Sequence, residues 1–217
     1  MDPDSPASSG HSSRDRRPIA VRSNALIQGF AAWLTRSGAS PNSISLVSIL
    51  FAALGAAALL RLPWPWAPWL CALAILLRLL CNLFDGMVAV EGGRQTSTGA
   101  LFNEVPDRIA DSLFLVALGY ACGFAWLGWL AALLAALTAY IRTLGGTLGL
   151  AQDFRGPMAK PHRMWLMGTA CVVAPIENWT TVTQIALPVT LVVIAAGAAL
   201  TCALRLRAIA QQLHARA

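Results

Sequence analysis

Long apolar runs separated by short polar segments dominate this sequence of 217 residues, of which 57% are hydrophobic and only 12% are charged. A membrane-spanning helix needs roughly 20 mainly apolar residues, so a chain of this length can hold about six of them. Backbone polar groups in lipid must pair within the chain, and the runs lack the alternating pattern of a membrane barrel. The sequence therefore predicts an all-α integral membrane bundle of six transmembrane helices.

Helix-start and interfacial signals help to place these spans. Ser40 and Pro41 precede the first span and are typical of a helix N-terminus. Trp64 and Trp66 lie between the first two spans and Trp69 begins the second, as expected for residues at a membrane–water interface. We expect the spans at about residues 44–60, 69–90, 101–120, 126–144, 164–176 and 182–204. Polar turns are expected at residues 91–99, 123, 153–163 and 177–179.

Lysine and arginine residues gather at alternate ends of the predicted spans, and only Arg61 falls on the opposite side. Because basic residues stay on the cytoplasmic side of membrane proteins, we expect both termini and the turns at 91–99 and 153–163 to face the cytoplasm. The expected location is a bacterial inner membrane. A net charge of +6 would suggest nucleic acid in a soluble protein, but this distribution indicates membrane lipid and no nucleic-acid partner.

The N-terminal region divides into two parts. Residues 1–20 are rich in Ser, Pro, Asp and Arg without an apolar run, which predicts a disordered cytoplasmic tail before a membrane domain at 21–217. Within that domain, Ile27, Phe30 and Leu34 form an apolar stripe over residues 24–36. This stripe predicts an interfacial amphipathic helix on the bilayer, with an exposed linker helix as the alternative.

Carboxylates and carboxamides interrupt the second and third apolar runs at helical spacing. Asn82 and Asp85 share one helix face, and Asn103, Asp107 and Asp111 share the next. Ionisable groups at membrane depth are costly and usually functional. Two such faces meeting across a short turn would gather oxygen ligands around one point, which suits a divalent cation such as Mg²⁺ or Mn²⁺.

These residues belong to one pattern of fixed spacing, Asn82-x2-Asp85-Gly86-x2-Ala89-Val90-x8-Gly99-x3-Asn103-x3-Asp107. The pattern resembles the signature of the CDP-alcohol phosphatidyltransferases, Asp-x2-Asp-Gly-x2-Ala-Arg-x8-Gly-x3-Asp-x3-Asp. All spacings agree. Three positions depart from it, because Asn82 and Asn103 stand where the family has aspartate and Val90 stands where it has arginine.

The resemblance implies a phospholipid-synthesis enzyme that transfers a phosphatidyl group from CDP-diacylglycerol to an alcohol and releases CMP, acting as a homodimer. It implies that Asp85 is a metal ligand and that Asp107 is the general base or a shared ligand. Asn82 and Asn103 can still coordinate through their amide oxygens, but each removes one negative charge. We therefore expect weaker metal binding, with one ion where the family holds two.

Two further carboxylates lie close to the pattern. Asp111, one helical turn deeper, either replaces a missing metal ligand or pairs with Arg78 inside the bundle. Glu104 is a second possible replacement.

The nucleotide site is also implied by the resemblance. Gly86 and Gly99, with Ala89 between them, would allow CDP to approach the backbone, although small residues also serve ordinary helix packing in lipid. Val90 cannot bind phosphate. Arg94, four residues later, is the expected substitute, with a simple positive-inside anchor as the alternative.

A basic group follows at the predicted cytoplasmic ends of the fourth and fifth spans, comprising Arg142, Arg155, Lys160 and Arg163. Clustered basic side chains bind phosphate, and the resemblance implies a phosphorylated polyol acceptor such as glycerol 3-phosphate. The alternative is attraction to anionic lipid. For the whole chain, two other functions remain open: a catalytically silent relative that binds CDP-lipid, and a small membrane transporter.

Overall fold

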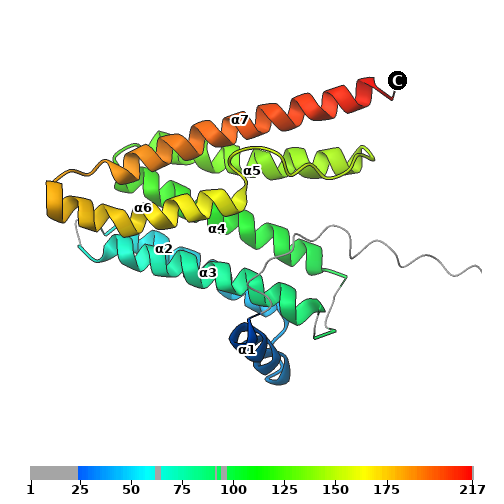
Figure 1. The fold of residues 1–217 in the computed structure, drawn as a ribbon, viewed down its shortest axis with the longest axis horizontal. Helices are drawn as coiled ribbons and strands as arrows, with labels where there is room; N and C mark the ends of the chain where they lie inside the picture. The colour runs from blue at the N-terminus through cyan, green and yellow to red at the C-terminus, as the bar shows by residue number, and fades with distance from the viewer. Residues whose placement is uncertain (1–23, 62–64, 91, 94–96, 217) are drawn as a thin grey trace, which may run out of the picture.

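The computed structural model describes residues 24–61, 65–90, 92–93 and 97–216, and across them the chain forms seven helices and no strand (Figure 1). The helices are α1 (Ala25–Arg36), α2 (Pro41–Leu59), α3 (Ala67–Val90), α4 (Gly99–Ala121), α5 (Ala125–Thr147), α6 (Lys160–Thr181) and α7 (Ala186–His214). The all-α prediction is confirmed. The predicted tail at residues 1–20 lies outside the described residues.

Four of the helices, α2, α3, α5 and α7, are long and apolar enough to cross a membrane, so the chain is an integral membrane protein. Helices α4 and α6 have similar lengths, 23 and 22 residues. They carry the charged residues that the other helices mostly lack, and this lowers their hydropathy. Their place within the same bundle puts those charges among apolar neighbours.

Helices α2 to α7 form a closed ring in which each packs mainly on two neighbours, in the order α3, α2, α4, α5, α7 and α6, with a smaller contact between α4 and α7. Helix α2 begins and α7 ends at the same end of the bundle (Figure 1). The apolar core lies toward the opposite end and includes Phe114, Leu118 and Met167. Polar side chains therefore concentrate in the half of the ring where α3 ends and α4 begins.

Local sequence explains where several helices start and stop. The Ser40 hydroxyl accepts a hydrogen bond from the backbone N–H of Ser43, and Pro41 opens the helix, as predicted for this N-terminus. Between α4 and α5 the chain turns at Gly123, where φ is +76°. The two helices then cross closely, because a Cβ on Gly119 would lie 2.6 Å from Cα of Gly128.

The predicted turn at residues 177–179 is wrong, because α6 continues to Thr181 and the chain turns at Val182, where φ is +57°. Glu177 is polar, and a polar residue between two apolar runs is typical of a turn. In the structure its carboxylate accepts hydrogen bonds from the backbone N–H groups of Ile185 (2.8 Å) and Ala186 (2.9 Å) at the start of α7. Those donors lack partners within their own helix, so Glu177 stabilises the next helix from the last turn of α6.

Helix α1 lies across one end of the bundle (Figure 1). Ala31 is buried against the end of α3, and the Phe30 ring lies 4.8 Å from that of Phe84. Leu26 and Trp33 are exposed, and the Trp33 ring lies 5.4 Å from that of Phe30. Part of the predicted apolar stripe thus packs on the bundle, because α1 and the end of α3 both present apolar residues.

Candidate active site

The two predicted helix faces meet between α3 and α4. The Asn82 amide donates a hydrogen bond to Oδ1 of Asp107 at 3.0 Å. One turn further along α3, Asp85 accepts a 2.6 Å hydrogen bond from the Ser45 hydroxyl of α2. Both carboxylates are buried, Asp85 with 7% and Asp107 with 4% of its surface exposed. Helical spacing alone therefore identified side chains that lie together.

Basic side chains surround Asp107 on its other sides. Arg78 of α3 donates to Oδ1 at 2.9 Å, and the Lys160 ammonium of α6 contacts Oδ2. Arg108, the next residue of α4, lies 3.8 Å from the same oxygen. Ionised partners at these distances hold Asp107 in one orientation, with both oxygens engaged.

Asp111 is more deeply buried and is also paired with basic side chains. Its Oδ2 lies 2.7 Å from Arg163, and its Oδ1 lies 3.4 Å from Arg78. Both arginines are fully buried. The pairing with Arg78 proposed as an alternative for Asp111 is therefore present, and a metal-binding role for Asp111 would require these contacts to break.

A cavity of about 250 Å³ opens beside Asp107 between α4, α5, α6 and α7. Three of the predicted phosphate-binding residues, Arg142, Lys160 and Arg163, line this cavity. Arg155 does not, because its exposed side chain pairs with Asp153 at 2.6 Å. The charged residues that line the cavity are Arg108, Arg142, Lys160, Arg163 and Arg205 against Glu104 and Asp107. Positive charge predominates, so the cavity is suited to an anion such as a phosphate group.

Arg108 and Arg205 also line the cavity, although neither is among the predicted site residues. Arg205 donates hydrogen bonds to the backbone oxygens of Arg155 (2.9 Å) and Thr138 (2.5 Å). An arginine within an otherwise apolar helix was the available signal, since such residues usually face the bundle interior. Arg108 could have been found from its position directly after Asp107, within a predicted span.

The loop before α6 is fastened to α7, and this fixes where Lys160 begins its helix. Gly156 has φ of +115°, and a Cβ there would lie 2.5 Å from Thr201. The Met158 N–H donates to the Thr201 hydroxyl at 3.1 Å. The loop therefore needs glycine at residue 156 both for its backbone conformation and for its close approach to α7.

The remaining predicted site residues are more peripheral. Asn103 is exposed and lines the mouth of the basic cavity. Gly86 and Ala89 are half-buried near the end of α3, and Gly99 is half-buried as the first residue of α4. Arg94 lies outside the described residues.

The residues present fit a divalent cation only if other ligands complete its coordination. Within the described parts of the chain, no three acidic, histidine or cysteine side chains gather closely enough to hold a metal ion. The available donors are the carboxylates Asp85 and Asp107 and the neighbouring carboxamides. Mg²⁺ commonly binds to one or two protein carboxylates and takes its other ligands from substrate phosphates and water. The donor set suits that kind of site.

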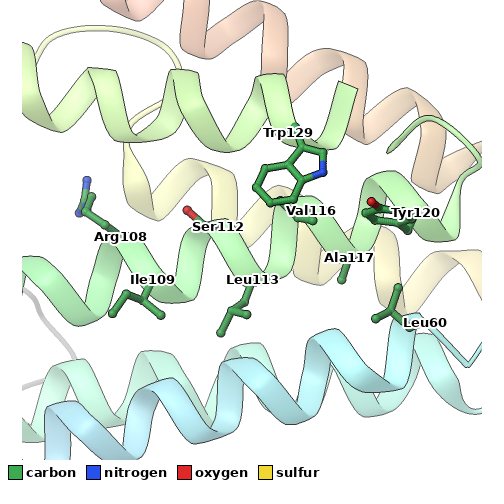
Figure 2. Close-up of a pocket in the computed structure, with 9 residues that line it drawn as sticks. All are labelled: Leu60, Arg108, Ile109, Ser112, Leu113, Val116, Ala117, Tyr120 and Trp129. Carbon is green, nitrogen blue, oxygen red and sulfur yellow. The ribbon is translucent and has the colours of Figure 1, made fainter. Parts of the chain in front are cut away.

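A second hollow of about 490 Å³ is an apolar groove along α4. Arg108 lies at one end of the groove, and Leu60 and Tyr120 lie at the other (Figure 2). Arg108 also lines the basic cavity, so this one side chain borders both spaces. The residues that line the groove are Leu60, Arg108, Ile109, Ser112, Leu113, Val116, Ala117, Tyr120 and Trp129.

Comparison with known proteins identifies relatives of similar sequence and fold. No protein-family model matches the chain. It is 35% identical over 134 residues to the archaetidylinositol phosphate synthase of Aeropyrum pernix, a match that covers 61% of this chain and 66% of that protein. It is 29% identical over 149 residues to the inner membrane protein YnbA of Escherichia coli, covering 68% of this chain and 74% of that protein.

Solved structures of the phosphatidylinositol phosphate synthase PgsA1 of Mycobacterium tuberculosis share the fold. One, in complex with manganese and citrate, aligns with a TM-score of 0.72 and 22% identity over 84% of this chain and 88% of that one. Another, with CDP-DAG bound, aligns with a TM-score of 0.71 and 22% identity over 86% of this chain and 94% of that one. The chain is a membrane enzyme, and it belongs to the CDP-alcohol phosphatidyltransferase family.

Proposed function

We propose that the protein transfers a phosphatidyl group from CDP-diacylglycerol to a hydroxyl of a phosphorylated polyol such as glycerol 3-phosphate, releasing CMP. One observation carries this proposal: the buried Asp107 lies between the polar face of α3 and a cavity lined mainly by basic side chains. A carboxylate next to an anion-binding cavity could receive a proton from an acceptor whose phosphate is held in that cavity.

The reaction assigns a role to each part of the site. The acceptor hydroxyl oxygen attacks the phosphorus that carries the diacylglycerol, and the bond from that phosphorus to the CMP oxygen breaks. CMP leaves with the bonding electron pair, and Asp107 takes the hydroxyl proton. Gly86, Ala89, Arg94 and Gly99 would contact the CDP group near the end of α3 and the start of α4.

We propose that Asp85 and Asp107 hold the Mg²⁺ or Mn²⁺, with help from Asn82, Asn103 or Asp111. The diphosphate of CDP-diacylglycerol would complete the coordination that these side chains leave open. Such an ion would neutralise charge that develops on the departing phosphate. Asp85 is the residue best placed for this role, because Ser45 provides only a neutral hydrogen bond to its carboxylate.

The basic cavity would select an acceptor that carries a phosphate. Arg142, Lys160 and Arg163 line it, and Arg205 adds a guanidinium from α7. Hydrogen bonds from charged donors to phosphate are short and strong. Two relatives are named as synthases of inositol phosphate lipids, so inositol phosphate belongs beside glycerol 3-phosphate among the acceptors to be tested.

In the membrane, we propose that α4 and α6 also span, giving six transmembrane helices, with α1 lying at the interface through Leu26 and Trp33. Both termini and the basic cavity would face the cytoplasm of a bacterial inner membrane. The active protein would be a homodimer. Mass photometry of the detergent-purified protein tests this oligomeric state, and a monomer at working concentrations would contradict it.

The deciding experiment measures CMP release from CDP-diacylglycerol by purified protein with Mg²⁺ or Mn²⁺. The acceptors are glycerol, inositol, glycerol 3-phosphate and inositol phosphate. Turnover should require a phosphorylated acceptor, because only that class can bind the basic cavity. Turnover with the unphosphorylated polyols at the same rate would contradict the proposed acceptor class.

A catalytically silent CDP-lipid-binding protein is the second candidate. The observation in its favour is that Arg78, Asn82 and Lys160 already contact the two oxygens of Asp107. Such a protein would bind CDP-diacylglycerol without releasing CMP under any condition of the same assay.

A further inference from the structure

The contacts of Asp107 differ in kind from those of Asp85. Oδ1 of Asp107 accepts hydrogen bonds from Arg78 and Asn82, and Oδ2 contacts the Lys160 ammonium. Asp85 accepts a hydrogen bond from the neutral hydroxyl of Ser45, and it forms no ion pair with any described residue. One carboxylate is thus neutralised by the protein itself, while the charge of the other remains to be balanced.

Charge counting leads to the same distinction. The polar centre contains the carboxylates Asp85, Asp107 and Asp111. The last two form ion pairs with Arg78, Arg108, Lys160 and Arg163. A divalent ion against Asp107 would lie next to both Arg78 and Lys160. Like charges a few ångströms apart in a poorly solvated site repel strongly. Acidic side chains at residues 82 and 103 could offset that repulsion, but both residues are asparagine.

Lys160 is held where it is by several contacts. It opens α6 directly after the loop that Gly156 and Met158 fasten to Thr201. Its ammonium is a compact point charge, which makes lysine better suited than arginine to the place of a metal ion. Packing of this loop on α7 therefore fixes the start of α6, and with it the position of the Lys160 ammonium next to Asp107.

We propose that the Lys160 ammonium takes the place of a divalent cation at Asp107, so that the site binds a single divalent ion, at Asp85. Because residues 82 and 103 are asparagine, they offer no acidic side chain to attract a second metal ion. The Lys160 ammonium supplies that positive charge instead. Because the ion at Asp85 is part of the proposed function, the inference rests on that function and specifies its metal requirement. It removes Asp107 from the metal ligands proposed above and leaves this carboxylate the role of proton acceptor alone.

Equilibrium Mn²⁺ binding to the purified full chain, saturated with CDP-diacylglycerol and without an acceptor, tests the proposal without turnover. The lipid supplies the phosphate ligands that the side chains leave open, and free Mn²⁺ is measured by electron paramagnetic resonance. The wild-type protein should bind one Mn²⁺ per chain. Asp85→Asn should abolish binding, whereas the matched Asp107→Asn should leave one ion bound. Two ions on the wild-type protein, none on it, or loss of the ion in Asp107→Asn would each overturn the proposal.

A gain of binding gives the complementary test. Asn82→Asp with Asn103→Asp should still bind one ion, because Lys160 remains. Adding Lys160→Met to this pair should allow a second ion, and adding Lys160→Arg should not. A second ion that appears with Lys160 still present would overturn the role assigned to the lysine. If the triple variants do not fold, Mn²⁺ binding by Asp85→Asn and Asp107→Asn alone decides whether the proposal holds.

CMP release by the same wild-type preparation separates this inference from the proposed function. One bound ion without turnover on any acceptor would leave the inference standing and reject the proposed reaction. Two bound ions with normal turnover would reject the inference and retain the reaction.

Discussion

At the scale of single residues, Arg78 joins the two buried carboxylates of α4. Arg78 lies on α3, one helical turn before Asn82. Its guanidinium lies 2.9 Å from Asp107 and 3.4 Å from Asp111. Removing one partner from a buried ion pair typically costs about 3–5 kcal/mol, because the other charge is left without compensation. The site residues therefore contribute to stability as well as to chemistry, and a mutational test must separate the two.

Asp107→Asn should lower the rate of CMP release by about 100- to 10,000-fold, the usual contribution of a general base. Binding of CDP-diacylglycerol should be largely unchanged, because the proton acceptor acts only during transfer. Single-turnover kinetics and lipid binding on the same preparation check this prediction. Asp111→Asn is the control. It should lower the unfolding temperature, and it should lower the rate of CMP release less than Asp107→Asn does. If Asp111→Asn proves more damaging to the rate, the base lies one turn deeper.

Arg142 inside the basic cavity and Arg155 outside it form a matched pair of arginines. Arg142→Ala should raise the KM for the phosphorylated acceptor by about tenfold to a hundredfold, the loss expected for a charged hydrogen bond, and should affect the KM for CDP-lipid much less. Arg155→Ala should change neither constant, because its side chain is exposed and does not line the cavity. Steady-state kinetics with each substrate varied in turn give the result. Equal changes in both constants for Arg142→Ala would instead indicate nonspecific attraction to anionic lipid.

Sequence spacing could predict which residues of α3 and α4 face one another, because residues three or four apart share a helix face. It could not predict that Lys160 contacts Asp107. That contact depends on how the 153–163 loop packs on α7, which no local pattern encodes. Arg155 shows the same limit, since it lies among the basic residues in sequence but outside the cavity in space.

At the scale of helices and loops, the connection before α6 determines how Lys160 and Arg163 are presented. Gly156→Ala should destabilise the fold by about 1–3 kcal/mol, because the residue has positive φ and its Cβ would clash with Thr201. Gly149→Ala is the matched control. Its φ is also positive, +73°, but the nearest atom to its Cβ is 3.8 Å away. Thermal unfolding of both variants checks the difference, and an equal effect would mean that the contact with Thr201 is unimportant.

Helix positions were largely predictable, and the exceptions have physical causes. The starts of α2 and α5 and the turn at Gly123 agree with the sequence-based boundaries to within a few residues. The turn after α6 does not, because Glu177 acts from within the helix as a cap for α7. A capping side chain that reaches the following helix cannot be distinguished from a turn residue by its polarity alone.

At the scale of the whole molecule, the ring of six helices separates two environments. The main apolar core fills one half, and the ion pairs of Arg78, Asp107 and Asp111 lie in the other, which also contains two smaller apolar clusters. A transporter would need a polar path through both halves, so the confined polar cluster agrees better with chemistry at one membrane surface. Apolar runs in the sequence predicted the bundle, whereas closure of the ring depends on contacts between distant helices.

The number of spans is the property of the whole molecule that most needs a direct test. Four helices meet the length and hydropathy expected of a span, while α4 and α6 carry the charges of the site. If all six helices cross, α5 ends on the cytoplasmic side, and a reporter fused after Gln152 reads cytoplasmic. If only the four apolar helices cross, the same fusion reads external, because α4 no longer reverses the chain.

Fusions at two more positions complete the topology experiment. A reporter after Gly123 should read external with six spans and cytoplasmic with four, the opposite of the result after Gln152. A reporter after Ala217 reads cytoplasmic in either case and serves as the control, since α2 begins and α7 ends at the same end of the bundle. We expect the six-span result, because Arg142, Lys160 and Arg163 would then lie on the cytoplasmic side with most other basic residues. An external signal after Gln152 would place the basic cavity on the wrong face of the membrane for a cytoplasmic phosphorylated acceptor.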